Sequence, residues 1–169
     1  MQPRIYWVDA PDVGRLAVVS RPDPAYGLAQ QMRALRDAGI TTLVSLLAPH
    51  EAARAGLGDE ASAARAAGLT FDTLPTSDFA VPPSFPEAAQ VIERVTKNLS
   101  AGHGVGAHCF AGRGRSPLFI AAVLVHQGYA SDTAIAAVSS ARGYRIPETA
   151  AQHRWIADFT DWCRSERMS

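Results

Sequence analysis

The chain has almost no lysine, only two cysteines, no long apolar run and no excess of either charge. Its 16 basic side chains balance its 16 acidic ones, so no overall field attracts nucleic acid or an anionic membrane, and any affinity for anions must be local. Lys97 is the only lysine. Cys109 and Cys163 lie far apart in the sequence and predict neither a disulfide framework nor a zinc site.

Nothing in the sequence has the pattern of a signal peptide or a membrane span. The N-terminal segment lacks the apolar stretch of a signal peptide. The longest apolar run, residues 118–125, has eight residues, whereas a membrane-spanning helix needs about 20. Together with the low cysteine content, these absences predict a cytoplasmic protein with no membrane insertion.

The composition is that of a folded protein, with 47% hydrophobic and 19% charged residues in a chain of 169. This length predicts a single domain over residues 1–169. Apolar periodicity and turn residues predict strands at 5–8, 15–20, 40–47, 69–74 and 105–108. They predict helices at 28–39, 59–67, 84–99, 115–127, 132–141 and 147–164, with Asp59, Ser84 and Ser131 as N-caps. Strands that alternate with helices predict an α/β fold, with a mostly parallel sheet flanked by helices on both faces.

The most informative segment is residues 108–116, which read HCFAGRGRS. Cys109 follows a predicted strand, Arg115 opens a predicted helix, and the loop between them contains Gly112 and Gly114. Such a loop can point its backbone N–H groups at an anion above the helix N-terminus. The same field favours the thiolate, and the arginine fork matches two phosphate oxygens. The alternative for Cys109 is a buried structural thiol.

This segment resembles the HCxxGxxR[ST] loop of the cysteine-dependent protein phosphatases, in particular the compact dual-specificity type. Residues 43–57 and 68–85 resemble the region before the active site in the cyclin-dependent-kinase-associated phosphatase group, and residues 141–159 resemble the closing helix of the family. The resemblance covers roughly residues 5 to 162, strongly at the loop and weakly elsewhere. It implies a loop between a strand and a helix that carries the catalytic thiol.

Cleavage of a phosphate ester by a thiolate also needs a proton donor for the leaving oxygen. Asp78, 31 residues before Cys109, is the best candidate because it lies in a proline-flanked loop, and the resemblance places the general acid on such a loop. Asp72 is the competitor, but it lies within a predicted strand. A plain turn aspartate remains the third interpretation.

His108 and Ser116, the residues next to Cys109 and Arg115 in the sequence, are also expected to contribute to the site. The resemblance implies that His108 orients the loop and tunes the pKa of the thiol, although a core histidine fits the same position. Ser116 is expected to donate a hydroxyl hydrogen bond to the sulfur when it leaves as thiolate. The alternative for Ser116 is an ordinary serine in the first turn of a helix.

The residues between the thiol and the arginine are expected to bind the phosphoryl group, mainly through backbone N–H groups. They are Phe110, Ala111, Gly112, Arg113 and Gly114. Lipid phosphatases of the tensin type carry basic residues at the positions that correspond to 110 and 113. Here only position 113 is basic, which argues against a phosphoinositide substrate, and the ring at position 110 either stacks at the rim or packs.

Four further side chains have weaker interpretations. Arg142 and Arg145 precede the last predicted helix, where related enzymes place a rim arginine for a second anionic group, but a solvated turn is favoured for both. The larger tyrosine phosphatases use a glutamine to position water, yet Gln152 is interpreted as a residue of the helix surface. Cys163 is expected to be an inert thiol.

The predicted activity is hydrolysis of a phosphate monoester through a cysteinyl-phosphate, with no metal or cofactor required. The substrate is a phosphorylated protein or a small phosphate ester. Alternatives that share a Cys-x5-Arg loop are a phosphoinositide phosphatase, a rhodanese-like sulfurtransferase, an arsenate reductase, and a docking module with low turnover. A low-molecular-weight tyrosine phosphatase is disfavoured, because that family has its loop near the N-terminus and its Asp-Pro acid downstream.

Overall fold

The computed structural model describes all residues, 1–169, and is built around a five-stranded sheet in the order β1-β2-β5-β3-β4. The strands are β1 (Ile5–Val8), β2 (Leu16–Val19), β3 (Ile40–Ser45), β4 (Thr70–Thr73) and β5 (Gly104–His108). β1 pairs antiparallel with β2, and the other three pairings are parallel. The expected mostly parallel sheet is therefore confirmed.

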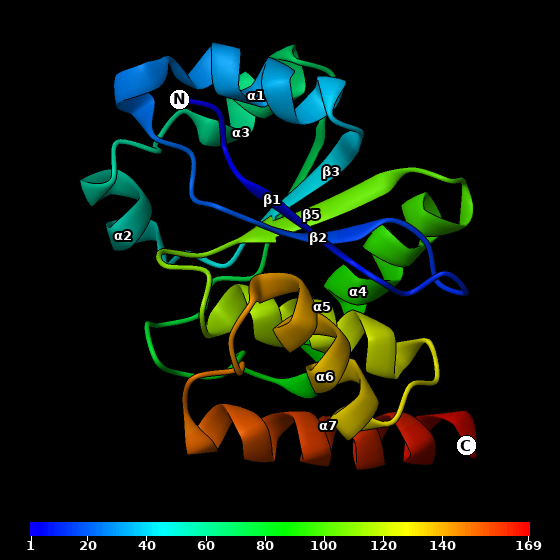
Figure 1. The fold of residues 1–169 in the computed structure, drawn as a ribbon. Coiled ribbons are helices and arrows are strands. Elements are labelled where there is room, and N and C mark those ends of the chain that lie inside the picture. Colours follow the sequence, from blue (N-terminus) through cyan, green and yellow to red (C-terminus); the bar gives the residue numbers. More distant parts are fainter.

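Helices cover both faces of this sheet (Figure 1). They are η1 (Pro24–Tyr26), α1 (Leu28–Asp37), α2 (Pro49–Arg54), α3 (Glu60–Ala66), α4 (Phe85–Ser100), α5 (Arg115–His126), α6 (Ser131–Arg142) and α7 (Ala150–Arg167). In Figure 1, α1 and α3 lie above the sheet and α4 to α7 lie below it. None of these helices combines the length and the apolar character needed to cross a lipid bilayer.

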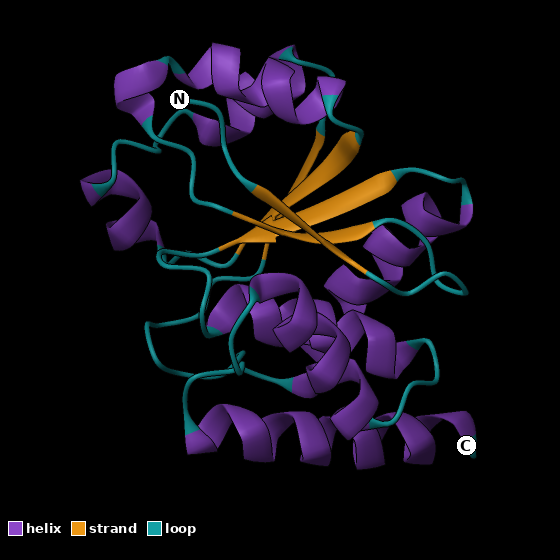
Figure 2. Cartoon of the chain, in the orientation of Figure 1, coloured by secondary structure: helices purple, strands orange, loops and turns teal.

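The core is divided by the sheet into a large and a small cluster. The large cluster holds 30 buried residues and includes every residue from Leu118 to Val125. α5 is therefore enclosed between the sheet and the neighbouring helices α4, α6 and α7 (Figure 2). The small cluster, eight residues around Met32 and Leu35, lies under α1 and α3. Burial of α5 fixes the direction from which its first turn approaches the end of β5.

The central strand β5 delivers the chain to the site. All five of its residues are buried, because β2 and β3 pair with it on either side. At Gly106 a Cβ atom would lie 2.6 Å from the Val19 side chain, so the strand has no room for a larger residue there. β5 ends at His108, and Cys109 follows at the carboxyl edge of the sheet, where parallel α/β sheets place their ligands.

The structure differs from the expected elements at several ends. The strand predicted at 40–47 ends at Ser45, and α2, which was not predicted, begins at Pro49 soon after it. The last helix begins at Ala150 rather than at residue 147, because Thr149 and Gln152 cap it reciprocally. Ser84 caps α4 as predicted.

Of the other two predicted N-caps, Ser131 is wrong, and Asp59 has the predicted position but makes no capping hydrogen bond. Ser131 is the first helical residue of α6, and Ala130 occupies the cap position with no side-chain hydrogen bond. Asp59 stands at the cap position of α3, but its side chain accepts no hydrogen bond from the first turn. Both helices are held by packing on the sheet or on α5 rather than by a capping side chain.

Candidate active site

The loop between β5 and α5 brings a thiol and a hydroxyl together. Cys109 Sγ and Ser116 Oγ lie 3.2 Å apart, and both residues are buried. Cys109 comes from the end of β5 and Ser116 from the first turn of α5, so the contact closes the loop at its base. A hydroxyl at this distance can donate a hydrogen bond to a thiolate.

The same loop presents a row of unused backbone donors. None of the five N–H groups of residues 110–114 donates a hydrogen bond to an acceptor within the chain. Gly112 has φ +69°, a conformation that favours glycine. A Cβ at Gly114 would lie 2.9 Å from the Gln152 amide and 3.0 Å from a Glu148 carboxylate oxygen. The two glycines therefore permit a tight loop whose N–H groups remain free for an external anion.

Arg115 is buried at the end of the loop and held from two sides. Its Nη1 and Nη2 atoms donate to the two Glu51 carboxylate oxygens at 2.7 and 3.0 Å. Nη1 also donates to the Thr76 carbonyl at 2.8 Å, and Nη2 lies 3.2 Å from Asp78 Oδ1. Burial opposes the charge of Arg115, but the hydrogen bonds with Glu51 and the nearby acidic groups outweigh it and raise the pKa of Arg115.

Glu51, near the start of α2, is the main carboxylate partner of this guanidinium. Its side chain is 12% exposed, and the hydrogen bond with Arg115 holds the pKa of Glu51 below its ordinary value. Glu51 Oε2 also accepts from the Ala48 N–H at 2.9 Å, which ties the carboxylate to the start of the helix. The guanidinium is thus oriented by a charged, anchored partner.

Asp78 reaches the site from the loop after β4. Its side chain is half exposed, and its Oδ1 atom accepts from the Phe79 N–H at 3.0 Å while facing Arg115. Phe79 has φ +61°, the only positive value in the chain outside glycine. Asp72, its competitor, lies on β4, and both its carboxylate oxygens accept hydrogen bonds from Arg94. Only Asp78 of the two lines the cavity above Cys109.

His108 lies behind the loop rather than in the cavity. It is fully buried, and its Nε2 atom lies 2.5 Å from Glu60 Oε1, itself buried at the start of α3. Its Nδ1 atom lies 3.2 Å from the Cys109 carbonyl oxygen. The imidazole therefore connects α3 to the backbone of Cys109, and it does not face an incoming substrate.

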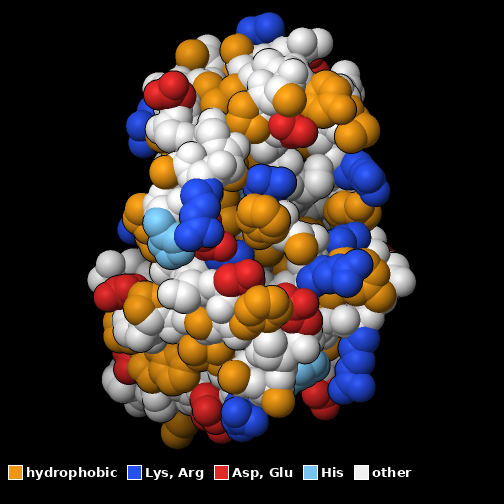
Figure 3. All heavy atoms as spheres, turned by 90° about the vertical axis from the view of Figure 1, so that its left-hand side faces the viewer, with side chains coloured by type: hydrophobic (Ala, Val, Ile, Leu, Met, Phe, Trp, Pro, Cys, Tyr) orange, Lys and Arg blue, Asp and Glu red, His pale blue; other side chains and the backbone are white.

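The cavity above Cys109 has a volume of about 470 Å³. Besides Cys109 and Arg115, its lining includes the exposed rings of Phe79 and Phe110 and the Arg113 guanidinium. Ala111 and Gly114 also line it, whereas Gly112 lines a neighbouring cavity. On this side of the molecule, basic, acidic and apolar side chains are interspersed, and no extended field of one charge forms (Figure 3).

Two side chains that were placed on the surface are part of the site. Gln152 is fully buried, and its Nε2 atom donates to the Ala80 carbonyl at 3.1 Å, which joins α7 to the Asp78 loop. Arg142 is half buried, and its Nε atom donates to the Gly112 carbonyl at 2.9 Å. Both interpretations as solvated residues are therefore wrong, because the loops fold onto α6 and α7. Arg145 is exposed.

Sequence analysis missed Glu51 and Glu60 as partners of Arg115 and His108. Glu51 follows a buried strand at the carboxyl edge of the sheet, and that position was an available signal. The sequence carried no signal for Glu60, because acidic residues are common in the first turn of surface helices. Cys163 is free and buried on α7, and burial raises the pKa of its thiol.

The profile of a family described as a polymorphic toxin system, DSP-PTPase phosphatase, matches residues 17–129, about two thirds of the chain. The chain belongs to the DSP-PTPase phosphatases. The predicted membership of the cysteine-dependent phosphatase superfamily is confirmed, and the protein is a cysteine-based phosphatase that hydrolyses phosphate monoesters. No curated protein sequence matches this phosphatase.

Solved structures show the same fold over almost the whole chain. Kinase-associated phosphatase, crystallised with its catalytic cysteine replaced by serine, is 18% identical with a TM-score of 0.84, and 98% of each chain is covered. PTPMT1 in complex with PI(5)P is 20% identical with a TM-score of 0.77, covering 95% of this phosphatase and 99% of PTPMT1. Human DUSP28 is 21% identical with a TM-score of 0.66, covering 95% and 97%.

Proposed function

We propose that Cys109 is the nucleophile of this phosphatase, Asp78 its general acid and Arg115 its phosphate clamp. The observation that carries this assignment is the loop itself. A buried thiol lies at its base, five unused N–H groups lie along it, and a charged guanidinium lies at its end. A tetrahedral dianion is the ligand that this set of donors fits.

In the first step the Cys109 thiolate attacks phosphorus, so an S–P bond forms as the bond from phosphorus to the leaving oxygen breaks. Asp78 gives its proton to that oxygen. Arg115 and the loop N–H groups hold the three oxygens of the phosphoryl group, whose charge spreads in a loose transition state. Arg115 Nη2 faces Asp78 in the free enzyme, so a bound phosphate competes with Asp78 for this donor.

In the second step water attacks phosphorus and the S–P bond breaks. Asp78, now a carboxylate, takes the proton from this water, and inorganic phosphate is released. The Ser116 hydroxyl, 3.2 Å from Cys109 Sγ, donates a hydrogen bond to the sulfur as it leaves. His108 serves as a positioning residue, since it contacts the backbone of Cys109 and lies outside the cavity.

Phosphorylated side chains of proteins are the substrate class that the cavity favours. The exposed rings of Phe79 and Phe110 both line the opening, and flat aromatic walls suit an aryl phosphate such as phosphotyrosine. A phosphoinositide is the second candidate, supported by Arg113 in the lining and by the PI(5)P complex of PTPMT1. Phe110 disfavours it, because the loop offers one basic side chain instead of two. A free thiol nucleophile supports a reducing, cytoplasmic location.

Trapping the covalent intermediate tests this assignment. In a rapid-quench experiment with ³²P-labelled phosphotyrosine peptide, the denatured wild-type protein should carry a covalent label on Cys109, located by peptide mapping. Cys109→Ser should lose at least about 10⁴-fold in kcat yet still bind the peptide. Cys163→Ala, the matched thiol control, should retain activity within twofold. Wild-type turnover by Cys109→Ser would rule out the assignment.

A further inference from the structure

The segment that carries Asp78 has few polar contacts with the rest of the protein. After its first residue, this acid loop, residues 76–83, makes only two polar contacts with other segments. In the first, Asp78 Oδ1 lies 3.2 Å from Arg115 Nη2. In the second, the Ala80 carbonyl accepts a hydrogen bond from Gln152 Nε2 at 3.1 Å. The position of the loop around Asp78 therefore depends on one arginine and one glutamine.

The contact with Arg115 is given up when a substrate binds. In the proposed mechanism this guanidinium holds phosphoryl oxygens, and Asp78 turns from it to the leaving oxygen. The Asp78 side chain is half exposed, so packing alone does not hold it there. Gln152 is then the one polar contact that still joins this part of the acid loop to another segment.

The amide of Gln152 is held in a single orientation. The residue is fully buried in the first turn of α7. Its Oε1 atom accepts from the Thr149 N–H at 3.2 Å, and its own backbone N–H donates to Thr149 Oγ1 at 3.1 Å. This reciprocal cap uses the amide oxygen, so the amide nitrogen is the atom that faces Ala80. Gln152 does not line the cavity above Cys109, and a substrate there does not touch it.

The same amide packs against the phosphate loop, residues 109–115. A Cβ atom at Gly114 would lie 2.9 Å from Gln152 Nε2 and 3.1 Å from Gln152 Oε1, so the two groups approach closely. Gly114 directly precedes Arg115 in the sequence. Gln152 therefore lies between the loop that binds phosphate and the loop that supplies the proton.

We infer that Gln152 is a positioning residue that couples these two loops. It holds the acid loop against the phosphate loop while Asp78 leaves Arg115 for the substrate. The inference rests on the proposed function, because it takes Asp78 as the general acid. Since Gln152 acts only through Asp78, loss of its donor should matter most where the leaving oxygen most needs a proton.

Gln152→Met tests the inference, because it removes the donor and keeps the length of the side chain. The value of kcat/KM for phenyl phosphate should fall about tenfold, the effect of about one net hydrogen bond. For p-nitrophenyl phosphate, whose leaving group needs less protonation, it should fall less than about twofold. In an Asp78→Asn background the same substitution should change neither value by more than about twofold, because the group that Gln152 positions is gone.

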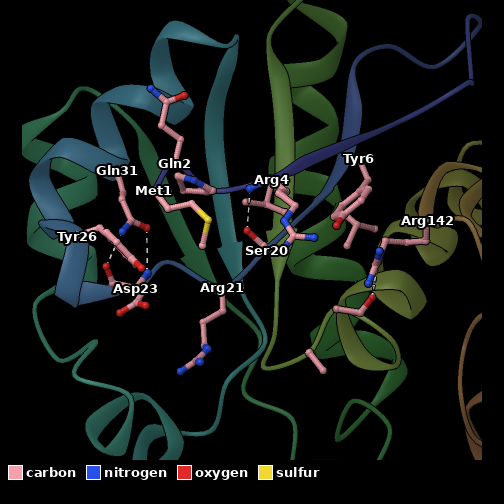
Figure 4. A pocket seen from close by; sticks show the side chains of 15 residues that line it. Met1, Gln2, Arg4, Tyr6, Ser20, Arg21, Asp23, Tyr26, Gln31 and Arg142 are labelled. Carbon is pink, nitrogen blue, oxygen red and sulfur yellow. Dashed lines mark hydrogen bonds between the residues drawn. The ribbon is translucent and has the colours of Figure 1, made fainter.

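Gln31 offers a matched control. It is a buried glutamine of α1 whose Nε2 atom donates to the Asp23 carbonyl and whose Oε1 atom accepts from the Asp23 N–H at 2.9 Å (Figure 4). It also joins a helix to a backbone segment outside that helix, but α1 lies across the sheet from α7 (Figure 1). Gln31→Met should lower the free energy of unfolding as Gln152→Met does, and it should leave the ratio of the two kcat/KM values unchanged.

An equal loss for the two substrates, or a loss that persists in the Asp78→Asn background, would show that Gln152 serves only the fold and would overturn the inference. So would a wild-type ratio in Gln152→Met. If that variant does not fold, Gln152→Glu takes its place, since it keeps the acceptor of the α7 cap and replaces the amide donor. Asp78→Asn alone tests the proposed function. A leaving-group-dependent loss there, with none in Gln152→Met, refutes only the coupling, whereas its absence in Asp78→Asn refutes the general acid itself.

Discussion

The phosphate loop, residues 109–115, and the acid loop, residues 76–83, face each other across one cavity but are built in opposite ways. Cys109 and Arg115 are each 3% exposed, and the loop continues directly from a buried strand into a buried helix. Asp78 is 50% exposed at its side chain and Phe79 is 61% exposed. One half of the site is part of the core, and the other lies on its surface.

Few contacts hold the acid loop in its position. The Thr76 carbonyl accepts from Arg115, Gln152 donates to the Ala80 carbonyl, and Asp78 itself faces Arg115. Phosphate binding must replace the last of these contacts, since Arg115 is also the proposed clamp. The buried half therefore needs rigidity to keep donors in place, whereas the exposed half needs freedom to move from arginine to leaving oxygen.

After the loss expected for Cys109→Ser, the largest expected effect comes from the exposed half. Asp78→Asn should lower kcat about 10² to 10⁴-fold, because it removes the proton for the leaving oxygen. The loss should be greater for phenyl phosphate than for p-nitrophenyl phosphate, whose leaving group needs less protonation. Asp72→Asn is the control, since Arg94 holds that carboxylate outside the cavity, and it should stay within twofold. Equal losses in the two variants would remove Asp78 from its role.

A substitution behind the buried half should lower the free energy of unfolding. Glu60→Ala leaves His108 buried without its charged partner and should lower the free energy of unfolding by about 3 kcal/mol. Chemical denaturation measures the change. Asp59→Ala, one residue earlier and without a side-chain hydrogen bond to its helix, should change it by less than about 0.5 kcal/mol. A comparable loss in both variants would show that the helix start, not the buried pair, matters.

Glu51→Gln should cost about 1 to 2 kcal/mol of unfolding free energy at pH 7, since its partner Arg115 is buried. The folded-state pKa of Glu51 is lowered by Arg115, so its contribution is complete above the ordinary value of about 4.5 and is lost as pH falls through the folded value. The difference between wild type and variant should therefore shrink on acidification below pH 4.5. A difference that is constant from pH 7 to pH 3 would contradict this linkage.

The smallest expected effect is a gain in stability rather than a loss. Phe79 combines a positive φ with an exposed ring, and asparagine adopts that backbone conformation at lower cost. Phe79→Asn should raise the free energy of unfolding by about 0.5 to 1 kcal/mol while lowering kcat/KM for aryl phosphates. Phe110→Asn, exposed but without a positive φ, should not be stabilised. If both variants behave alike in thermal unfolding, the strain at Phe79 plays no role.

Most of the fold was predictable because its signals are local. Apolar runs bounded by glycine and proline marked all five strands, and the Ser84 cap marked α4. The short helix α2 was missed because six residues carry little periodicity. Residues 108–116 also predicted the buried half of the site, since the thiol, glycines and arginine are covalently close.

The rest depended on contacts between residues distant in sequence. Glu51 lies 64 residues before Arg115, Glu60 lies 48 before His108, and Gln152 bonds a carbonyl 72 residues away. Gln152 and Arg142 were predicted to be solvated, because the sequence near a helix end does not indicate which loop packs against it. Burial of a polar side chain depends on its neighbours in space, which periodicity cannot reveal.

The sequence alone determined the proposed nucleophile and its anion-binding loop, because these need only nine consecutive residues that form a strand end, a tight loop and a helix start. Their partners were decided by the sheet. It brings α2, α3 and the acid loop to the carboxyl end of β5. There the carboxylates on these segments pair with Arg115 and His108. The neighbouring cavity that Gly112 lines also depends on tertiary structure, since Arg4, Arg21 and Arg142 come from the ends of β1, β2 and α6. Electrostatic pairing acts over a few ångströms of space, whatever the separation along the chain.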